Sequence, residues 1–311
     1  MKSSNIGGQA VMEGVMMKNG DEYAVAVRKP DGEIEVKKET YHSVIKWKAL
    51  TRIPFIRGVF NFIDSMVLGM KTLTYSASFF EEEEEENQKS LTAEEAKKAE
   101  KKESLLMGVV VTFSMVLAVA IFMVLPYMII NLVSNIITSR IALSALEGVL
   151  RIVIFIGYIV LISKMEDIRR VYMYHGAEHK CINCIEHGLD LTVENVRKSS
   201  KQHKRCGTSF LLFVVLVSCV MAFFIQSDSQ LVKIGLRIAL VPVIAGISYE
   251  LIKWAGNSEN PLINAISKPG LWMQNLTTRE PDDSMIEVAI QSVEAVFDWR
   301  AYKEENFGAE Q

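Results

Sequence analysis

The chain has 311 residues, of which 50% are hydrophobic and 23% charged, and its formal net charge is −3. This charge excludes a general role in binding nucleic acid, which requires a basic surface. Four cysteines in so long a chain do not form a disulfide framework. Long apolar runs are confined to residues 105–253, whereas residues 1–104 and 254–311 are polar. This partition predicts a mainly α membrane protein with soluble ends.

Residues 1–80 are expected to form a cytoplasmic region with a β-hairpin and an interfacial helix. Two alternating runs, Tyr23–Arg28 and Glu33–Lys37, flank Pro30-Asp31-Gly32, a combination typical of a hairpin. Residues 1–40 are expected to be β as a whole, with an irregular segment opening at Gly7-Gly8 and the glycines of the Gly-rich start in turns. Between Ile53 and Leu73 apolar residues recur at helical spacing, which predicts an amphipathic helix on the membrane surface. A helix of a soluble core is the alternative.

Residues 81–104 are strongly charged and are expected to form a solvated linker or a charged helix. Residues 105–253 are predicted to form a membrane domain of about four transmembrane helices joined by a cytoplasmic loop, residues 164–207. A helix needs about 20 mostly apolar residues to cross the hydrocarbon core of a bilayer. The predicted spans are Leu105–Ile129, Leu143–Ser163, Thr208–Ile225 and Lys233–Lys253.

The second and fourth predicted spans contain charged residues, which are costly inside a bilayer unless they are paired. Glu147 and Arg151 are four residues apart on one helix and are expected to pair, while Arg237 and Glu250 need partners on other helices. These four residues also support the hypothesis of a transporter for a small solute or ion. The chain shows no inverted repeat, which places this hypothesis behind the two given below.

Lys and Arg are concentrated at both ends of the chain and in residues 164–207. The two short connections, about 130–142 and 226–232, contain only Arg140. The positive-inside rule therefore places both termini and the 164–207 loop in the cytoplasm of a multi-pass protein of the inner or plasma membrane. The lipid bilayer is its expected partner. Cytoplasmic thiols stay reduced, so the cysteines of the loop are candidate metal ligands or free thiols and not disulfides.

The 164–207 loop contains the residues that point to chemistry. His175-x-x-Glu178-His179 is an H-x-x-E-H pattern, the inverted zincin signature. Residues i and i+4 of a helix share a face, so both imidazoles can reach one cation. Glu178 lies on the adjacent row and is the candidate catalytic residue, a general base toward a metal-bound water.

Helical phase separates the neighbouring candidates. At about 100° per residue, Glu186 shares the face of His175 and His179. Three other residues of the loop point elsewhere and are interpreted as bystanders: Cys181, Cys184 and His187.

His203 and Cys206 lie just before the third predicted span. The second span is expected to continue without a break into the H-x-x-E-H segment, so a hairpin of two spans would bring both segments together. We expect a divalent metal ion, most simply zinc, at this junction. The candidate ligands are His175, His179, His203, Cys206 and Glu186.

The tail, residues 254–311, is expected to be cytoplasmic. Ser284 and Glu287 form a capping box at the start of an amphipathic helix whose apolar face begins with Ile286. This helix is expected to pack either on the cytoplasmic domain or on a protein partner.

Five segments together resemble a known family. They are Gly7–Met17, Tyr174–Lys180, Leu191–Arg197, Arg205–Phe210 and Leu276–Asp283. In combination they resemble the YqhQ-like family of uncharacterised bacterial membrane proteins, described as predicted metal-dependent enzymes. The resemblance covers nearly the whole chain and implies a multi-span membrane protein, without naming a substrate. It implies a metal site at His175, Glu178, His179, His203 and Cys206. Lys204 and Cys181 stand where this family is expected to have Pro and Thr.

Two further hypotheses about function therefore precede the transporter. The first is a cytoplasm-facing membrane metalloenzyme, a zinc-dependent hydrolase of unknown substrate in which Glu178 activates water. The second is a non-catalytic membrane assembly or biogenesis factor in which a closed metal site fixes the 164–207 loop.

Overall fold

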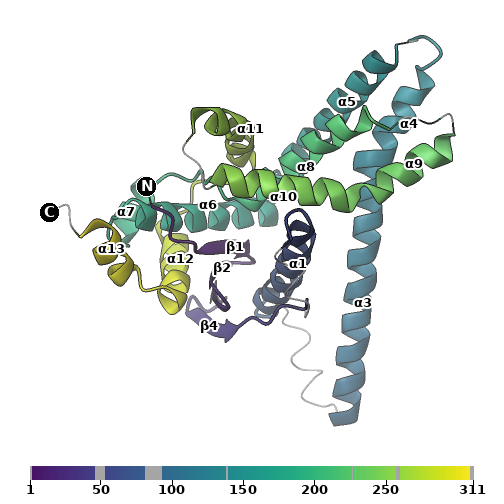
Figure 1. Ribbon diagram of the computed structural model, residues 1–311. Helices are drawn as coiled ribbons and strands as arrows, with labels where there is room; N and C mark the ends of the chain where they lie inside the picture. Colours follow the sequence, from purple (N-terminus) through teal and green to yellow (C-terminus); the bar gives the residue numbers. More distant parts are fainter. Residues whose placement is uncertain are drawn as a thin grey trace. The chain divides into compact units, whose positions relative to one another are not determined.

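The computed structural model describes residues 2–45, 53–80, 93–137, 139–225, 227, 229–256 and 260–308. The described chain is mainly helical, with one small antiparallel sheet near its N-terminus (Figure 1). It divides into two compact units. Unit 1 consists of Met1–Phe80, Ile159–Phe213 and Ala245–Gln311, and unit 2 of Glu81–Tyr158 and Val214–Ile244.

Unit 1 begins with a four-stranded sheet whose strands follow one another in chain order. The strands are β1 (Gly7–Val11), β2 (Gly14–Asn19), β3 (Glu22–Arg28) and β4 (Ile34–Thr40). The predicted hairpin is confirmed, since Arg28 of β3 pairs with Ile34 of β4. The prediction of β structure for residues 1–40 is confirmed, and Gly20, with φ 60°, lies in the turn between β2 and β3 as expected. The expectation of an irregular segment at Gly7-Gly8 is wrong, because both residues lie in β1. Gly14 also lies in a strand, where it allows close packing. A Cβ at Gly14 would overlap the carbonyl oxygen of Ala26 on the adjacent strand.

One face of the sheet packs against α6 (Glu166–Glu186) and α12 (Asp283–Val296). Alternate residues of β2 and β3 point to this face, as the two-residue period of a strand requires. They are Val15, Met17, Ala24 and Ala26. The small Ala24 lets α12 approach, and the Ser292 hydroxyl donates to the Ala24 carbonyl at 3.1 Å. The apolar face of α12, the helix expected from the tail sequence, is thus buried against the sheet and α6 of its own chain.

The other face of the sheet packs on α1 (Ile56–Ala77), which confirms the predicted helix in this region. The α1 residues buried against the protein are mostly small: Gly58, Leu68, Gly69, Thr72 and Ser76. Its larger apolar residues are exposed, among them Ile56, Ile63, Val67 and Leu73. A soluble core helix would bury these large side chains instead, so the arrangement favours the membrane-surface interpretation, which stays a prediction.

Further helices lie wholly within unit 1. They are α7 (Val193–Lys198), α11 (Pro261–Thr277) and α13 (Trp299–Phe307). Three helices contribute residues to both units: α5 (Arg140–Ile162), α8 (Gly207–Ala222) and α10 (Val241–Gly256). Unit 2 further contains α3 (Ala93–Val119), the π-helical turn η2 (Ala120–Val124), α4 (Leu125–Leu132) and α9 (Gln230–Ala239). The first half of the predicted charged segment 81–104, residues 81–92, lies outside the described residues, and its second half is helical in α3.

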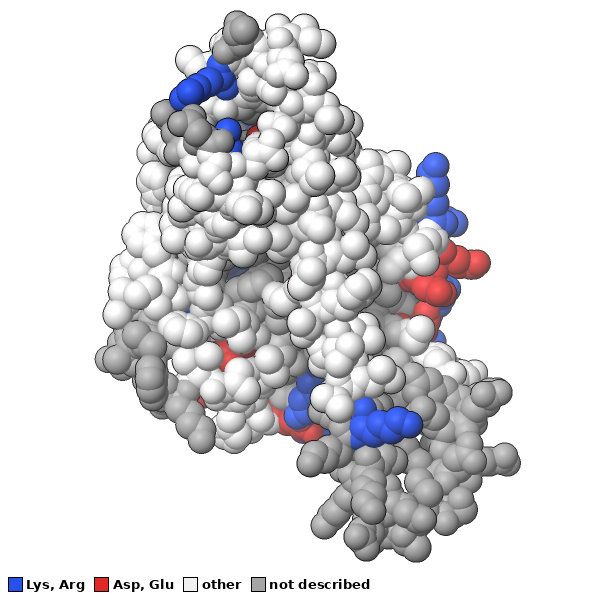
Figure 2. Space-filling model, turned by 90° about the vertical axis from the view of Figure 1, so that its right-hand side faces the viewer, with Lys and Arg blue, Asp and Glu red and all other residues white. Residues whose placement is uncertain are grey.

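Among the described residues, two helical segments are long and apolar enough to cross a membrane, Leu105–Leu132 and Arg140–Ile162. A third exists if α9 and α10, which bend by 41° at their junction, count as one span. Pro242 in the first turn of α10 has no N–H to continue the α9 ladder, which accounts for this break. Figure 2 shows the side of the molecule that carries α3, where a broad surface lacks Lys, Arg, Asp and Glu.

Among the residues that the structure describes, two or three of the four predicted spans are therefore long and apolar enough, and a set of four is not shown. The third predicted span is the 16-residue helix α8, which is shorter than the about 20 residues that a bilayer requires. Its apolar run continues to Ile225, but residues 223–225 form turn hydrogen bonds with Val220, Met221 and Ala222 instead of further helix.

Two local expectations are also wrong. The second span does not continue unbroken into the H-x-x-E-H segment, because α5 ends at Ile162 and Met165 is extended, with ψ 135°. The acidic residues that follow Met165 favour a new helix N-terminus there. The cap of α12 is Asp282 and not Ser284, since the Asp282 carboxylate accepts the Met285 N–H at 3.0 Å.

Candidate metal centre in unit 1

Helix α6 places His175 and His179 one turn apart on one face, as their spacing predicts. Their ring centroids are 4.4 Å apart. His179 is buried, at 1% exposure, and the side chain of His175 is 14% exposed. The two imidazoles therefore lie side by side at the edge of the core of unit 1.

Backbone carbonyls fix the orientation of both rings. The Nδ1 of His175 lies 2.9 Å from the Thr277 carbonyl oxygen, and the Nδ1 of His179 lies 2.6 Å from that of Lys201. A carbonyl oxygen can only accept a hydrogen bond, so each Nδ1 carries the proton and each Nε2 keeps its lone pair. Metal-binding histidines usually have this arrangement, in which a carbonyl or carboxylate holds the second nitrogen.

Cys206 completes a group of three potential ligands. It directly precedes α8, and its Sγ lies 3.2 Å from the Nε2 of His175. The Thr208 N–H donates to this sulfur at 3.4 Å, and the Thr208 hydroxyl lies 3.0 Å from it. The potential ligand atoms of the two histidines and Cys206 all lie within 4.8 Å of one another.

Glu178 faces the same group. Its Oε2 is 3.9 Å from the Nε2 of His175 and 3.8 Å from the Nε2 of His179. Burial raises the pKa of Glu178 to about 7, although the nearby His175 and a hydrogen bond from the Gly8 backbone act in the opposite direction. The carboxyl group thus lies beside the two imidazoles without forming a hydrogen bond to either.

Side chains of α6 also hold the loop that follows α7. The Lys180 ammonium donates to the carbonyls of Arg197 and Ser199 at 2.9 and 2.8 Å. The Asn183 amide donates to Ser200 and Gln202 at 2.7 and 2.9 Å. These contacts position the Lys201 carbonyl that orients His179. The helical pattern of the sequence does not reveal the role of Lys180 and Asn183, because that role depends on carbonyl groups of a distant loop.

The connection between α11 and α12 positions the site from the other side. The Arg279 N–H donates to the Tyr172 carbonyl at 2.8 Å, and a Cβ at Gly176 would overlap the Arg279 carbonyl oxygen. Gln274 is fully buried, and its side chain both accepts the His203 N–H and donates to the His203 carbonyl, each at 2.8 Å. The segment Leu276–Asp283 is one of the five that carry the family resemblance, but only the fold shows that it lies beside His175.

His203 and Glu186 form a polar pair beside the three-ligand group. The His203 Nε2 is 3.5 Å from the Glu186 carboxylate, which also accepts the Ser4 N–H at 2.8 Å and pairs with Arg205. Burial lowers the pKa of His203. Burial alone would raise the pKa of Glu186, but hydrogen bonds from His203, Arg205 and Ser4 outweigh it and lower the pKa to about 2. The ring centroid of His203 is 5.7 Å from that of His179.

The three residues interpreted as bystanders lie apart from this group. Cys181 and Cys184 belong to the apolar core of unit 1. Burial raises the pKa of Cys184 to about 11 and that of Cys181 well above its ordinary value. The Nδ1 of His187 is held by the Asn183 carbonyl of its own helix at 2.7 Å.

A comparison with known proteins places this chain in a family. The family model described as "Protein of unknown function (DUF1385)" matches residues 53–299. The chain belongs to this family. The matched region contains the whole of the H-x-x-E-H segment, His203 and Cys206, so the group of potential ligands lies inside the part that defines the family.

A bacterial relative confirms the resemblance that the five sequence segments indicate. The Bacillus subtilis (strain 168) protein described as "Uncharacterized protein YqhQ" is 35% identical over 301 residues. The alignment covers 96% of this chain and 94% of that protein. No solved structure matches this chain.

Proposed function

We propose that unit 1 carries a divalent-metal centre, most simply zinc, and that the chain is a membrane-associated metal-dependent hydrolase. The observation that carries the proposal is the convergence of three potential ligand atoms on one point. These atoms are the Nε2 of His175, the Nε2 of His179 and the Sγ of Cys206. Both histidines already have the tautomer that leaves Nε2 able to bind a metal.

The two imidazole nitrogens and the thiolate sulfur suit zinc, and three protein ligands would leave one coordination position open. Zinc binds imidazole nitrogen and thiolate sulfur, and a catalytic zinc site usually has three protein ligands and one open position. Zinc at this point would supply a Lewis acid that activates water near neutral pH. The Glu178 carboxylate, within 4 Å of both imidazoles, is placed to accept a proton from such a water. These residues support hydrolysis as the reaction type.

One observation favours a non-catalytic alternative. The buried Nε2 of His203 faces the Glu186 carboxylate at 3.5 Å, a distance longer than an ordinary hydrogen bond, so this nitrogen is only weakly engaged. If the 199–206 loop moved toward α6, His203 would supply a fourth ligand and close the site. A closed site is structural, and it would suit an assembly or biogenesis factor in which the metal fixes this loop.

The proposal includes a multi-pass arrangement in the inner or plasma membrane. The long apolar helices of unit 2 support insertion into a bilayer, and the distribution of Lys and Arg supports cytoplasmic termini and a cytoplasmic metal centre. A hydrolase with this arrangement would act on a substrate that is reached from the cytoplasm or from the inner leaflet.

Metal analysis tests the centre directly. We expect the purified wild-type protein to contain about one equivalent of zinc per chain, measured by plasma mass spectrometry. His179→Ala and Cys206→Ala should each lose at least about nine-tenths of it, because a site with two remaining ligands binds weakly. His187→Ala is the matched control on the same helix and should keep its metal. Equal zinc in wild type and in His179→Ala would contradict the proposal.

The variant Glu178→Gln distinguishes the enzyme hypothesis from the structural alternative when zinc content and complementation are both measured. Both hypotheses expect the variant to keep its zinc, since Glu178 is not a ligand in either. Only the enzyme requires its carboxylate. We expect Glu178→Gln to fail to complement a deletion strain that the wild-type gene rescues. Full complementation by a zinc-loaded Glu178→Gln variant would favour the structural role.

A further inference from the structure

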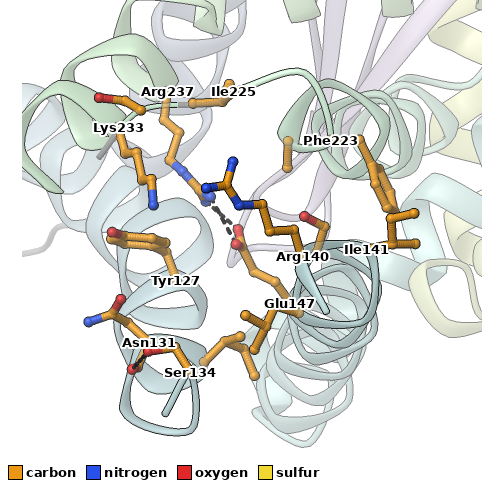
Figure 3. A pocket seen from close by; sticks show the side chains of 15 residues that line it. Tyr127, Asn131, Ser134, Arg140, Ile141, Glu147, Phe223, Ile225, Lys233 and Arg237 are labelled. Atoms are coloured by element: carbon orange, nitrogen blue, oxygen red, sulfur yellow. Dashed lines mark hydrogen bonds and ion pairs between the residues drawn. The ribbon is translucent and has the colours of Figure 1, made fainter. Parts of the chain in front are cut away.

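Unit 2 contains a polar cavity that is separate from the metal centre. It measures about 220 Å³, enough for several water molecules or one small polyatomic anion. Its walls come from α4, α5, α9 and the end of α8. The charged residues that line it are Arg140, Glu147, Lys233 and Arg237. Figure 3 shows the side chains of Arg140 from α5 and of Lys233 and Arg237 from α9 reaching toward the same space.

The buried charged residues at and next to this cavity carry a net positive charge: Glu147 and Arg237 line it, and Arg151 pairs with Glu147. The Glu147 carboxylate pairs with Arg237, with Nη2 to Oε2 at 2.8 Å, and with Arg151 at 2.7 Å. The Arg151 guanidinium also donates to the Ser218 hydroxyl at 2.8 Å. All three charged side chains are at most 6% exposed, so one carboxylate compensates two buried guanidinium groups. An uncompensated charge is costly in an apolar unit, and a bound anion would remove that cost.

The rim of the cavity adds two further cations. Among the described residues, neither Arg140 nor Lys233 lies within ion-pair distance of a carboxylate. The Lys233 ammonium is 6.0 Å from the centre of the Tyr127 ring, and the Arg237 guanidinium is 4.5 Å from it. Two cations of the cavity, Lys233 and Arg237, thus lie near the Tyr127 ring. The carboxylate of the cavity lining, Glu147, is already paired with Arg151 and Arg237.

Hydrogen-bond donors in the cavity also lack acceptors. Tyr127 is 7% exposed, and its hydroxyl has no hydrogen-bond partner in the described part of the chain. The buried Nε of Arg237 likewise has no hydrogen-bond partner among the described residues. A ligand with several acceptor oxygens would satisfy these donors together with the guanidinium of Arg140 and the ammonium of Lys233.

We propose that this cavity binds a phosphate group, either as inorganic phosphate or as the headgroup of an anionic lipid. Phosphate carries the negative charge that the surplus of cations requires and is small enough for the cavity. Its several oxygens can accept hydrogen bonds from the donors that lack partners. Arg140, Lys233 and Tyr127 supply the contacts to it, while the Glu147 pair with Arg151 and Arg237 holds the cavity in shape. This site is independent of the metal centre, which lies entirely in unit 1.

The double variant Arg140→Gln/Lys233→Gln tests the site without disturbing the buried ion pairs. Thermal unfolding of detergent-purified protein is followed with inorganic phosphate and with chloride at equal ionic strength. Native mass spectrometry after incubation with phosphatidylglycerol or phosphatidylcholine vesicles reports retained lipid. Loss of two charged contacts should weaken binding about tenfold or more. The matched control is Lys102→Gln/Lys198→Gln, which removes two exposed charges elsewhere.

A second variant, Tyr127→Phe, keeps the ring and removes only the hydroxyl, with the exposed Tyr158→Phe as its control. The proposal expects wild type and both controls to bind phosphate or phosphatidylglycerol, with Tyr127→Phe weaker and the double variant weakest. Stabilisation by phosphate alone assigns a soluble anion, and retention of phosphatidylglycerol alone assigns a lipid headgroup. Binding of neither probe overturns the proposal, as does equal binding by wild type and by a double variant that unfolds at the wild-type temperature without phosphate.

Discussion

At the scale of single residues, the partner of the second ring nitrogen separates the histidines of α6. His187 has its Nδ1 on a carbonyl of its own helix, whereas His175 and His179 have theirs on Thr277 and Lys201. Those two carbonyls come from separate segments of the fold and turn both rings so that Nε2 faces Cys206. Residue type alone therefore does not distinguish a ligand from a bystander, because ring orientation is decided by the neighbours.

Glu186 leads to a prediction about acid stability. Its pKa in the folded protein, about 2, lies below the ordinary value of 4.5. The stability that it contributes is therefore fully present above pH 4.5 and is lost as the pH falls toward 2. Glu186→Gln should remove this dependence and lower the free energy of unfolding near neutral pH by roughly 2 kcal/mol, because Arg205 loses its carboxylate.

Denaturant unfolding at neutral and acid pH measures this effect. Glu194→Gln is the control, since its ion pair with Lys198 is exposed on both sides and should contribute little. An acid profile of Glu186→Gln that matches the wild type would show that Glu186 does not stabilise the fold through its charge.

At the scale of elements, the site depends on how closely β1 approaches α6. A Cβ added at Gly8 would lie 2.7 Å from the Cγ of Glu178 and 2.8 Å from the Met16 carbonyl oxygen. One of these neighbours is the backbone of β2, which cannot move without disturbing the sheet. Gly8 thus allows the sheet to cover Glu178 and keep its carboxyl group away from solvent.

Gly8→Ala is accordingly expected to destabilise unit 1 by about 1–3 kcal/mol, as overpacking does in other cores. It should also weaken zinc binding, because Glu178 and its helix must shift. Gly7→Ala is the matched control one residue earlier in the same strand, where an added Cβ meets nothing within 4 Å. Thermal unfolding and zinc content check both effects. Equal behaviour of the two variants would contradict the close packing of β1 on α6.

At the scale of the whole molecule, the two units differ in what they expose. Unit 1 has an apolar core between its sheet, α6 and α12. In unit 2, an apolar stretch of 18 residues within Leu105–Leu132 contains no buried residue. Such a surface is costly in water and is explained by contact with a bilayer.

The proposed orientation predicts which positions a membrane-impermeant maleimide reaches. A cysteine at Ser139, beside Arg140 in the first short connection, should be labelled in intact cells. A cysteine at Ala301 on α13 should be labelled only after lysis, because the C-terminus is expected in the cytoplasm. The native cysteines give little background, since Cys181, Cys184 and Cys206 are buried and Cys219, which is partly buried, lies within the apolar helix α8. Labelling of Ala301→Cys in intact cells would show that the C-terminus lies outside the cytoplasm and would contradict the proposed orientation.

The sequence alone was sufficient for features that depend on local spacing. It predicted the hairpin of β3 and β4 and the helix α1, and it placed His175, Glu178 and His179 together on one helix. It also predicted the pairing of Glu147 with Arg151, which the structure confirms at 2.7 Å. These features follow from the two-residue period of strands, the 3.6-residue period of helices and the cost of unpaired charge.

Only the tertiary structure decided features that depend on contacts between distant segments. It brought Cys206 to His175 and directed Glu186 and His203 toward each other, although helical phase had placed Glu186 with the ligands. It also ended α8 after 16 residues, which no count of apolar residues reveals. The physical reason is the same in each case. Helical phase determines the side of a helix on which a residue lies, but the elements packed against that side determine which atoms it meets.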